Sequence, residues 1–206
     1  MAQTISFERV TTEYYDVLKE LGNIGAGNAT TALAQMLQTK VDMKVPQVKL
    51  LDFKDVGEEM GGEEQMVVGI YLAVEGDITG SIMFILEHNA GKSLVSKLMG
   101  TPPAEGDFSD MEISAMKEIG NIITGAYLNS LAQITNLKMI PSIPDLNIDM
   151  LNAILSVPAI EFGIVGDQIL LIQTVFTDDV DLNGYFILMP DLDSYSKMLG
   201  ALGLSI

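Results

Sequence analysis

The chain has 206 residues, no cysteine and a formal net charge of −17, because 28 acidic residues outnumber 11 basic ones. Phosphate binding needs clustered Lys and Arg, so this charge argues against nucleic acid or an anionic membrane surface as a partner. The missing cysteines exclude disulfides and thiolate chemistry, and the lack of an apolar span or a leader-like N-terminus predicts a cytoplasmic protein with no membrane contact.

The first half of the chain predicts a long helix, an extended segment, a hairpin and a short helix. The long helix follows from Leu, Ile and Ala at spacings of three and four, and the hairpin from two apolar runs joined by a short turn. A glycine marks the end of the short helix. The predicted elements are helix 9–37, extended 41–53 with a break at Pro46, acidic loop 54–64, strands 65–74 and 80–86, and helix 89–99 ending before Gly100.

The second half follows a Pro- and Gly-containing linker at residues 102–107 and predicts the same order, with one addition. Ser109 and Glu112 are spaced as a capping box, so the second long helix should begin there. Residues 145–157 carry apolar side chains at helical spacing and predict an extra helix that the first half lacks. The other predicted elements are the long helix to about 136, extended 138–144, strands 168–176 and 184–189, and helix 192–202.

Residues 20–37 and 118–135 repeat each other, with eight of eighteen positions identical. This duplication predicts one domain over 1–206, built from two repeats at about 9–100 and 109–203. Hairpins flanked by helices predict an α+β fold, in which strands of both halves share an antiparallel-type sheet. A pseudo-two-fold axis would place the two long helices at equivalent surface positions. Because internal symmetry can replace a dimer, we expect a monomer.

One face of each long helix carries the same kind of polar strip. Residues four, three and four positions apart share a helical face, so each strip presents an acid or hydroxyl, a carboxylate, a carboxamide and finally a glycine. The strips are Asp16, Glu20, Asn23 and Gly27 in the first helix, and Ser114, Glu118, Asn121 and Gly125 in the second.

The first strip lies in a glycine-rich stretch. Gly22, Gly25 and Gly27 each cost the helix about 1 kcal/mol relative to alanine, so something should approach this backbone closely. One interpretation is tight packing against another helix of this protein, and the other is clearance for a partner. A nucleotide-binding loop is disfavoured, because the glycine spacing is wrong and no strand precedes it.

The remaining chemistry of the strips is sparse. The single histidine, His88, is predicted to be a surface or capping residue, so neither a Ser-His-Asp arrangement nor a transition-metal cluster is expected. An Asn carboxamide can both accept and donate a hydrogen bond and so orient a water, and a Glu carboxylate can pair with Lys or Arg. Such a pair makes sense if the rest of the site lies on another molecule. The alternative is a solvated helix face.

The two strips resemble the signature of the CheC/CheX/FliY phosphatases of bacterial and archaeal chemotaxis. That signature is Asp or Ser, three residues, Glu, two residues, Asn, twenty-two residues and Pro. This sequence meets it twice without departure, ending at Pro46 and at Pro144, which we interpret as structural members of the motif.

The resemblance implies a substrate, the aspartyl phosphate of the response regulator CheY. Asn23 and Asn121 would position the attacking water, and Glu20 and Glu118 would pair with a lysine of the regulator's site. The chain would hold no cofactor of its own, because the regulator would supply Mg²⁺. The residues expected to lie against the regulator are Asp16, Gly27, Ser114 and Gly125.

The resemblance also implies a contact with the receptor deamidase CheD. The predicted extra helix breaks the internal symmetry, so Asp149 is the candidate contact, and an internal packing helix is the alternative. Two further interpretations stay open. One is a non-catalytic adaptor that binds CheD or a flagellar-switch component, and the other is a structural domain whose repeat reflects only ancestry.

Overall fold

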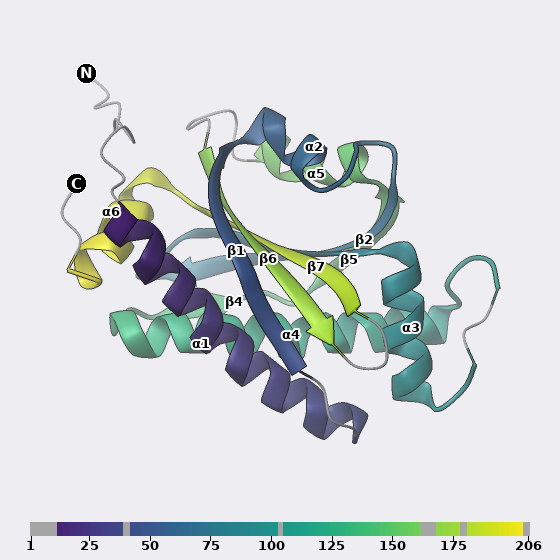
Figure 1. The fold of residues 1–206 in the computed structure, drawn as a ribbon. Helices are drawn as coiled ribbons and strands as arrows, with labels where there is room; N and C mark the ends of the chain where they lie inside the picture. The colour runs from purple at the N-terminus through teal and green to yellow at the C-terminus, as the bar shows by residue number, and fades with distance from the viewer. Residues whose placement is uncertain (1–11, 39–41, 103–104, 162–167, 178–180, 204–206) are drawn as a thin grey trace.

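The structure is a computed structural model that describes residues 12–38, 42–102, 105–161, 168–177 and 181–203. A seven-stranded antiparallel sheet has helices on both faces (Figure 1). The helices are α1 Thr12–Leu37, α2 Val56–Glu59, α3 His88–Met99, α4 Asp110–Thr135, α5 Leu151–Glu161 and α6 Leu192–Ala201. The strands are β1 Asp42–Asp52, β2 Met66–Gly76, β3 Gly80–Glu87, β4 Met139–Pro141, β5 Asp145–Met150, β6 Gln168–Thr177 and β7 Asp181–Pro190.

The sheet interleaves the two halves of the sequence. Its order is β1-β6-β7-β3-β2-β4, and β5 also pairs with β2. Thus β1 from the first half extends the hairpin of the second, and β4 and β5 from the second half extend the hairpin of the first. The prediction of an α+β fold with one shared antiparallel sheet is confirmed, while the limits of the two repeats stay a prediction.

The pairing of β3 with β7 has two-fold symmetry. Gly80 lies opposite Pro190, and Leu86 lies opposite Gly184. The pattern is unchanged when the two strands exchange roles, so that Gly80 takes the place of Gly184 and Leu86 that of Pro190. A two-fold axis through the middle of this ladder would exchange β3 with β7, and that the same axis relates α1 to α4 stays a prediction.

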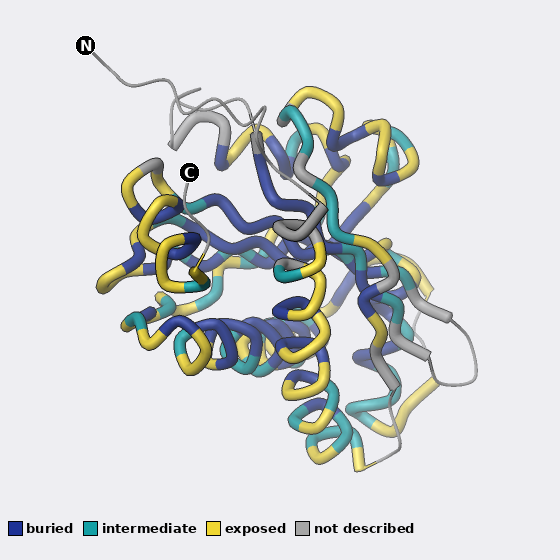
Figure 2. The backbone as a smooth tube through the Cα atoms, turned by 60° about the vertical axis from the view of Figure 1, so that its left-hand side comes forward, coloured by how far each residue is buried: buried dark blue, intermediate teal, exposed yellow. Residues whose placement is uncertain are grey.

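Alternation along the strands divides the core into two layers. On β3, Ile82, Phe84 and Leu86 belong to the cluster that contains α1 and α4, whereas Met83 and Ile85 belong to the cluster that contains α2 and α5. Successive strand residues point to opposite faces, so both faces of the sheet are buried. Figure 2 shows the strands mostly buried and the outer sides of the helices exposed.

The predicted helix over 145–157 is wrong in its first half. Residues 145–150 form β5, which pairs with β2, and the helix α5 begins only at Leu151. Leu146 and Ile148 are half-buried while Asp145, Asn147 and Asp149 are exposed, which is the period of two of a strand. The segment is also no addition to the repeat. Strand β5 leads into α5, which packs on the same face of the sheet as α2. In the first half, β1 leads into α2 in the same way.

Several local predictions are confirmed. The Ser109 capping box is complete, and Gly100 ends α3 with φ 65°. The prediction of an acidic loop at 54–64 is partly wrong, because residues 53–59 form a 3₁₀ turn, Phe53–Asp55, followed by α2. Val56 is fully buried and anchors this short helix on the sheet. The expected start of the first helix at residue 9 lies outside the described residues.

Candidate functional site

Both polar strips face outward on their helices. The exposed members are Asp16, Glu20, Asn23 and Gly27 on α1, and Ser114, Glu118 and Asn121 on α4, with Gly125 half-buried. The opposite face of each helix points inward. On α4, for example, Ile119 and Ile123 are fully buried in the layer against the sheet. Packing of the apolar face therefore holds the Glu–Asn face toward solvent, as the sequence pattern predicted.

The four Glu and Asn side chains have no recorded partner within the described part of the chain. Among the described residues, the structure records no hydrogen bond or ion pair to the side chains of Glu20, Asn23, Glu118 or Asn121. Their carboxylates and carboxamides are thus free to bond with another molecule. Within each strip the Glu and the Asn lie about one turn apart and share a face.

The two strips differ in their first member. The Ser114 hydroxyl donates to the Asp110 carbonyl oxygen at 2.9 Å, so it is turned back into its own helix. Asp16 presents an exposed carboxylate instead. The α1 strip consequently carries two negative charges, Asp16 and Glu20, and the α4 strip carries one.

A glycine precedes the Asn of each strip and lets the helix lie directly on the sheet. A Cβ added at Gly120 would come within 2.4 Å of Ile70 Cδ1 on β2. A Cβ added at Gly22 would lie 3.2 Å from Val45 Cγ1 on β1. Contacts below 3.0 Å force a neighbour to move. The Asn121 turn is therefore held more tightly to the sheet than the Asn23 turn.

The other glycines of the glycine-rich stretch in α1 show where it packs tightly within the protein and where it leaves clearance for a partner. At Gly25 an added Cβ would lie 2.4 Å from Tyr127 Cδ2, so this glycine packs tightly against α4. At Gly27, and at Gly125 on α4, an added Cβ would meet nothing within 4 Å. Tight packing within the protein thus accounts for Gly22 and Gly25, and open space lies beside Gly27.

Pro46 lies within β1 and Pro144 in the connection between β4 and β5, so neither motif proline is on a helix. Pro46 stands where the pairing of β1 with β6 shifts between Lys44 and Gln47. Pro144 stands between β4 and β5, which pair with β2. Because proline lacks an N–H, it interrupts each ladder at the corresponding place.

A buried ion pair at the start of α4 was not foreseen from the sequence. Lys92 of α3 donates to the Asp107 carbonyl oxygen at 2.8 Å and to Glu112 Oε1 at 3.2 Å. Its Nζ lies 4.3 Å from the centroid of the Phe108 ring. The backbone N–H and the hydroxyl of Ser109 donate to Glu112, and these bonds, with Lys92, hold the pKa of Glu112 below its usual value despite burial. The one sequence signal was a lysine on the apolar face of α3.

Two other predicted residues lie on different elements from the strips. Asp149 is exposed on β5, and its Oδ1 accepts a hydrogen bond from the Met150 N–H at 2.7 Å. His88 begins α3, is half-buried and stands edge-on to Phe108, with ring centroids 5.1 Å apart. It is therefore a packing residue in the first turn of α3, whose N-cap is Glu87, rather than the predicted surface or capping residue.

The described part of the chain contains no group of three or more His, Asp or Glu side chains that could hold a metal ion. In the same residues, no helix has the length and apolar character needed to cross a bilayer.

Comparison with known proteins gives one family. The profile of the CheC-like family matches residues 15–50 and 111–148, which contain both strips and both prolines. The chain is 38% identical to the CheY-P phosphatase CheC of Bacillus subtilis (strain 168), over 97% of this chain and 99% of that protein.

Two solved structures have a similar fold. Thermotoga maritima FliY gives a TM-score of 0.77 at 20% identity, covering 95% of this chain and 98% of that one. A chain of the CheX-CheY-BeF3-Mg²⁺ complex from Borrelia burgdorferi gives 0.52 at 16% identity, covering 83% and 96%. At these identities the likeness concerns the fold alone.

Proposed function

The chain belongs to the CheC-like family, and on that premise we propose that it is a phosphatase that removes the aspartyl phosphate from the response regulator CheY. The Bacillus subtilis relative, alike over nearly its whole length, is named for this activity. The observation that carries the proposal is the pair of exposed Glu–Asn turns, whose polar side chains have no recorded partner among the described residues.

In the proposed reaction, Asn23 or Asn121 enters the regulator's site and orients the attacking water. The carboxamide oxygen accepts one hydrogen bond from the water, while the carboxamide N–H groups can donate to another oxygen. The water oxygen attacks phosphorus, the bond from phosphorus to the aspartyl oxygen breaks, and the carboxylate and inorganic phosphate are released. Because an acyl phosphate is already reactive, alignment supplies most of what a catalyst must add.

The carboxylates of Glu20 and Glu118 are proposed to pair with a lysine of the regulator. Each lies about one turn from its Asn, so an ion pair there would fix how deeply the Asn enters. A charge-assisted hydrogen bond of this kind gives geometry as well as energy. Gly27 and Gly125 lie one turn farther along, and the open space beside them would admit the regulator's surface.

The Mg²⁺ of the reaction is proposed to belong to the regulator. The described residues of this chain offer no cluster that fits such an ion, so we derive no step through a metal bound here. The CheX-CheY-BeF3-Mg²⁺ complex, one chain of which has a similar fold, contains such an ion together with CheY, and the proposal follows that arrangement.

The test is the decay of radiolabelled CheY-P with and without this protein. Asn23→Ala combined with Asn121→Ala should reduce the decay to that of the regulator alone, while far-UV circular dichroism stays unchanged. Asn152→Ala, an exposed asparagine on α5, is the matched control and should keep full activity. If the double variant hydrolyses CheY-P as fast as the unmodified protein, the assignment is wrong. An adaptor without activity would leave the decay unchanged even with the unmodified chain.

CheD stays a proposed second partner, with Asp149 as its contact. Asp149 lies exposed on strand β5 rather than on an extra helix, so the proposal now depends on its exposed carboxylate and no longer on a break in the internal symmetry. Asp149→Lys should abolish capture of purified CheD by this protein. Undiminished capture would remove Asp149 from the interface.

A further inference from the structure

We propose that Tyr127 on α4 is a positioning residue for Asn23 on α1, so that the first site is held in place by the helix of the second. This inference rests on the proposed function, because it names what sets the geometry of one of its two asparagines.

The Tyr127 ring lies against the backbone of α1. A Cβ added at Gly25 would lie 2.4 Å from Tyr127 Cδ2 and 2.7 Å from Cε2, so only glycine leaves room for the ring at this separation. Gly25 is two residues beyond Asn23, within the same helical turn. The Asn23 turn thus rests on a side chain from the other repeat as well as on Val45 of β1.

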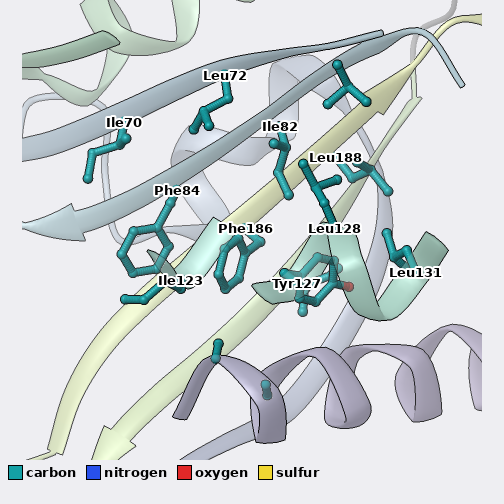
Figure 3. Packing of buried hydrophobic residues seen from close by; sticks show 14 of the residues in the cluster. Ile70, Leu72, Ile82, Phe84, Ile123, Tyr127, Leu128, Leu131, Phe186 and Leu188 are labelled. Atoms are coloured by element: carbon teal, nitrogen blue, oxygen red, sulfur yellow. The ribbon is translucent and has the colours of Figure 1, made fainter. Parts of the chain in front are cut away.

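The ring is held from behind by the sheet. Tyr127 is 1% exposed and stacks on Phe186 of β7, with centroids 5.0 Å apart and 18° between the ring planes. Phe186 in turn lies 4.7 Å from Phe84 of β3. Figure 3 shows Tyr127 between Phe186 and the ribbon of α1. These aromatic contacts form a continuous column from the sheet to α1, so the ring cannot retreat without repacking the core.

A hydrogen bond one turn farther along fixes α1 lengthwise. Asn28 Nδ2 donates to Ser130 Oγ at 2.8 Å, joining the two helices. The Ser130 hydroxyl donates to the Ala126 carbonyl oxygen at 2.8 Å, which sets its orientation. The Tyr127 contact therefore sets the height of α1 above the sheet, and the Asn28 bond opposes sliding along α4.

The corresponding support of the second site comes from the sheet. The Asn121 turn rests on the sheet through Gly120 and Ile70. When the two repeats are aligned at their Glu–Asn pairs, Gly25 corresponds to Ile123, and Tyr127 corresponds to Ala29. The large side chains thus come from α4 and the small ones from α1. The Asn121 turn is therefore supported by the sheet, and the Asn23 turn is supported in part by a side chain of α4.

A small shift of α1 is expected to slow the reaction at the first site. A displacement of about 1 Å in a positioning group can cost about a hundredfold in rate. A Cβ at Gly25 must either lift α1 or push aside a ring that Phe186 supports. Lifting α1 moves Asn23 with it, while Asn121 on α4 stays where the sheet holds it.

The experiment measures each site separately in the full-length chain. Asn121→Ala leaves the first site, and Asn23→Ala leaves the second. Adding Gly25→Ala should lower kcat for CheY-P at least about tenfold in the first background and less than about twofold in the second. KM should change less than about twofold, because Glu20 lies more than one turn before Gly25 and is displaced less than Asn23. Gly200→Ala, where an added Cβ meets nothing within 4 Å, is the matched control and should leave both rates unchanged.

Rescue separates positioning from damage to the fold. Tyr127→Val removes the two nearest ring carbons, and the Cγ position that remains lies 3.2 Å from the added Cβ. With Gly25→Ala, it should return first-site kcat to within about threefold of Tyr127→Val alone. Tyr127→Phe keeps the ring and should give no rescue. Urea unfolding of each variant shows that the protein assayed is folded.

Equal losses at both sites, no loss at either site, or no rescue by Tyr127→Val would each overturn the inference. Loss of all activity in the Asn121→Ala variant would overturn the inference too, because Asn23 would then not work as a site. Activity of the Asn23→Ala variant would in that case still support the proposed function. Full activity of Asn23→Ala with Asn121→Ala would instead reject the proposed function itself.

Discussion

The two site helices present the same Glu–Asn pair but rest on different supports. The α4 turn lies directly on β2, with an added Cβ at Gly120 only 2.4 Å from Ile70, and its helix starts at a complete capping box. The α1 turn lies more loosely on Val45, at 3.2 Å, and depends on the Tyr127 ring. Both strips face solvent, away from these supports. The space beneath each helix sets its packing, so the supports can diverge while the strips stay alike.

The largest difference between the two site helices is expected in the loss of stability when the glycine that precedes each Asn is replaced. Gly120→Ala should destabilise the protein by about 2–3 kcal/mol, because Ile70 is fully buried and its Cγ2 and Cβ also lie at 2.8 and 3.3 Å from the added atom. Gly22→Ala should change stability by less than about 1 kcal/mol, since a mild contact is offset by the better helix propensity of alanine. Urea unfolding of both variants measures the difference. Equal losses would show that the two helices are supported alike.

The second difference concerns the start of α4 and depends on pH. Hydrogen bonds from Ser109, with Lys92 nearby, hold the pKa of Glu112 below its usual 4.5, although burial opposes them. A lowered native pKa stabilises the fold above about pH 4.5, and this contribution is lost as the pH falls through the lowered value. Glu112→Gln cannot titrate, so it should be less stable than the unmodified protein near pH 7, and the gap should shrink toward about pH 3.

Thermal or urea unfolding over that pH range checks the prediction. Asp110→Asn, which changes an exposed carboxylate of the same helical turn, is the control and should give a smaller, nearly constant difference. A gap for Glu112→Gln that stays constant with pH would mean that ionised Glu112 does not stabilise the start of α4.

The smallest expected difference between the two sites is in how strongly salt affects their activity. The first strip carries exposed Asp16 and Glu20, whereas Ser114 leaves Glu118 as the one carboxylate of the second strip. Salt screens exposed charges over about 10 Å at 0.1 M, so raising the salt should weaken the first site more, by about two- to threefold in kcat/KM. The single-site variants Asn121→Ala and Asn23→Ala allow this measurement. Asp16→Ser in the first background should remove the extra salt dependence, and an unchanged slope would contradict this account.

The sequence predicted the features that have local causes. The long helices follow from apolar periodicity, the start of α4 from the Ser109–Glu112 spacing, and the end of α3 from Gly100 in the left-handed region. The outward direction of both strips also followed, because a helix with one apolar face must turn its other face to solvent.

The features that depend on distant neighbours could not be predicted. Leu146 and Met150 fit a helical period and hid the alternation of β5, whose partner β2 lies far back in the chain. The Lys92–Glu112 pair forms across the linker between the halves. The glycines of α1 predicted a close approach, but only the structure shows that Tyr127, 102 residues after Gly25, makes it.

The central claim is that the two asparagines act on the bound regulator rather than hold it. The direct measurement uses the double variant that carries Asn23→Ala and Asn121→Ala, and it has two parts. The first is the affinity of this variant for beryllofluoride-activated CheY. The second is the single-turnover decay of CheY-P at saturating concentrations of the same variant. We predict affinity within about threefold of the unmodified protein and decay no faster than that of CheY-P alone. A saturated complex that still releases phosphate at the unmodified rate would contradict the account.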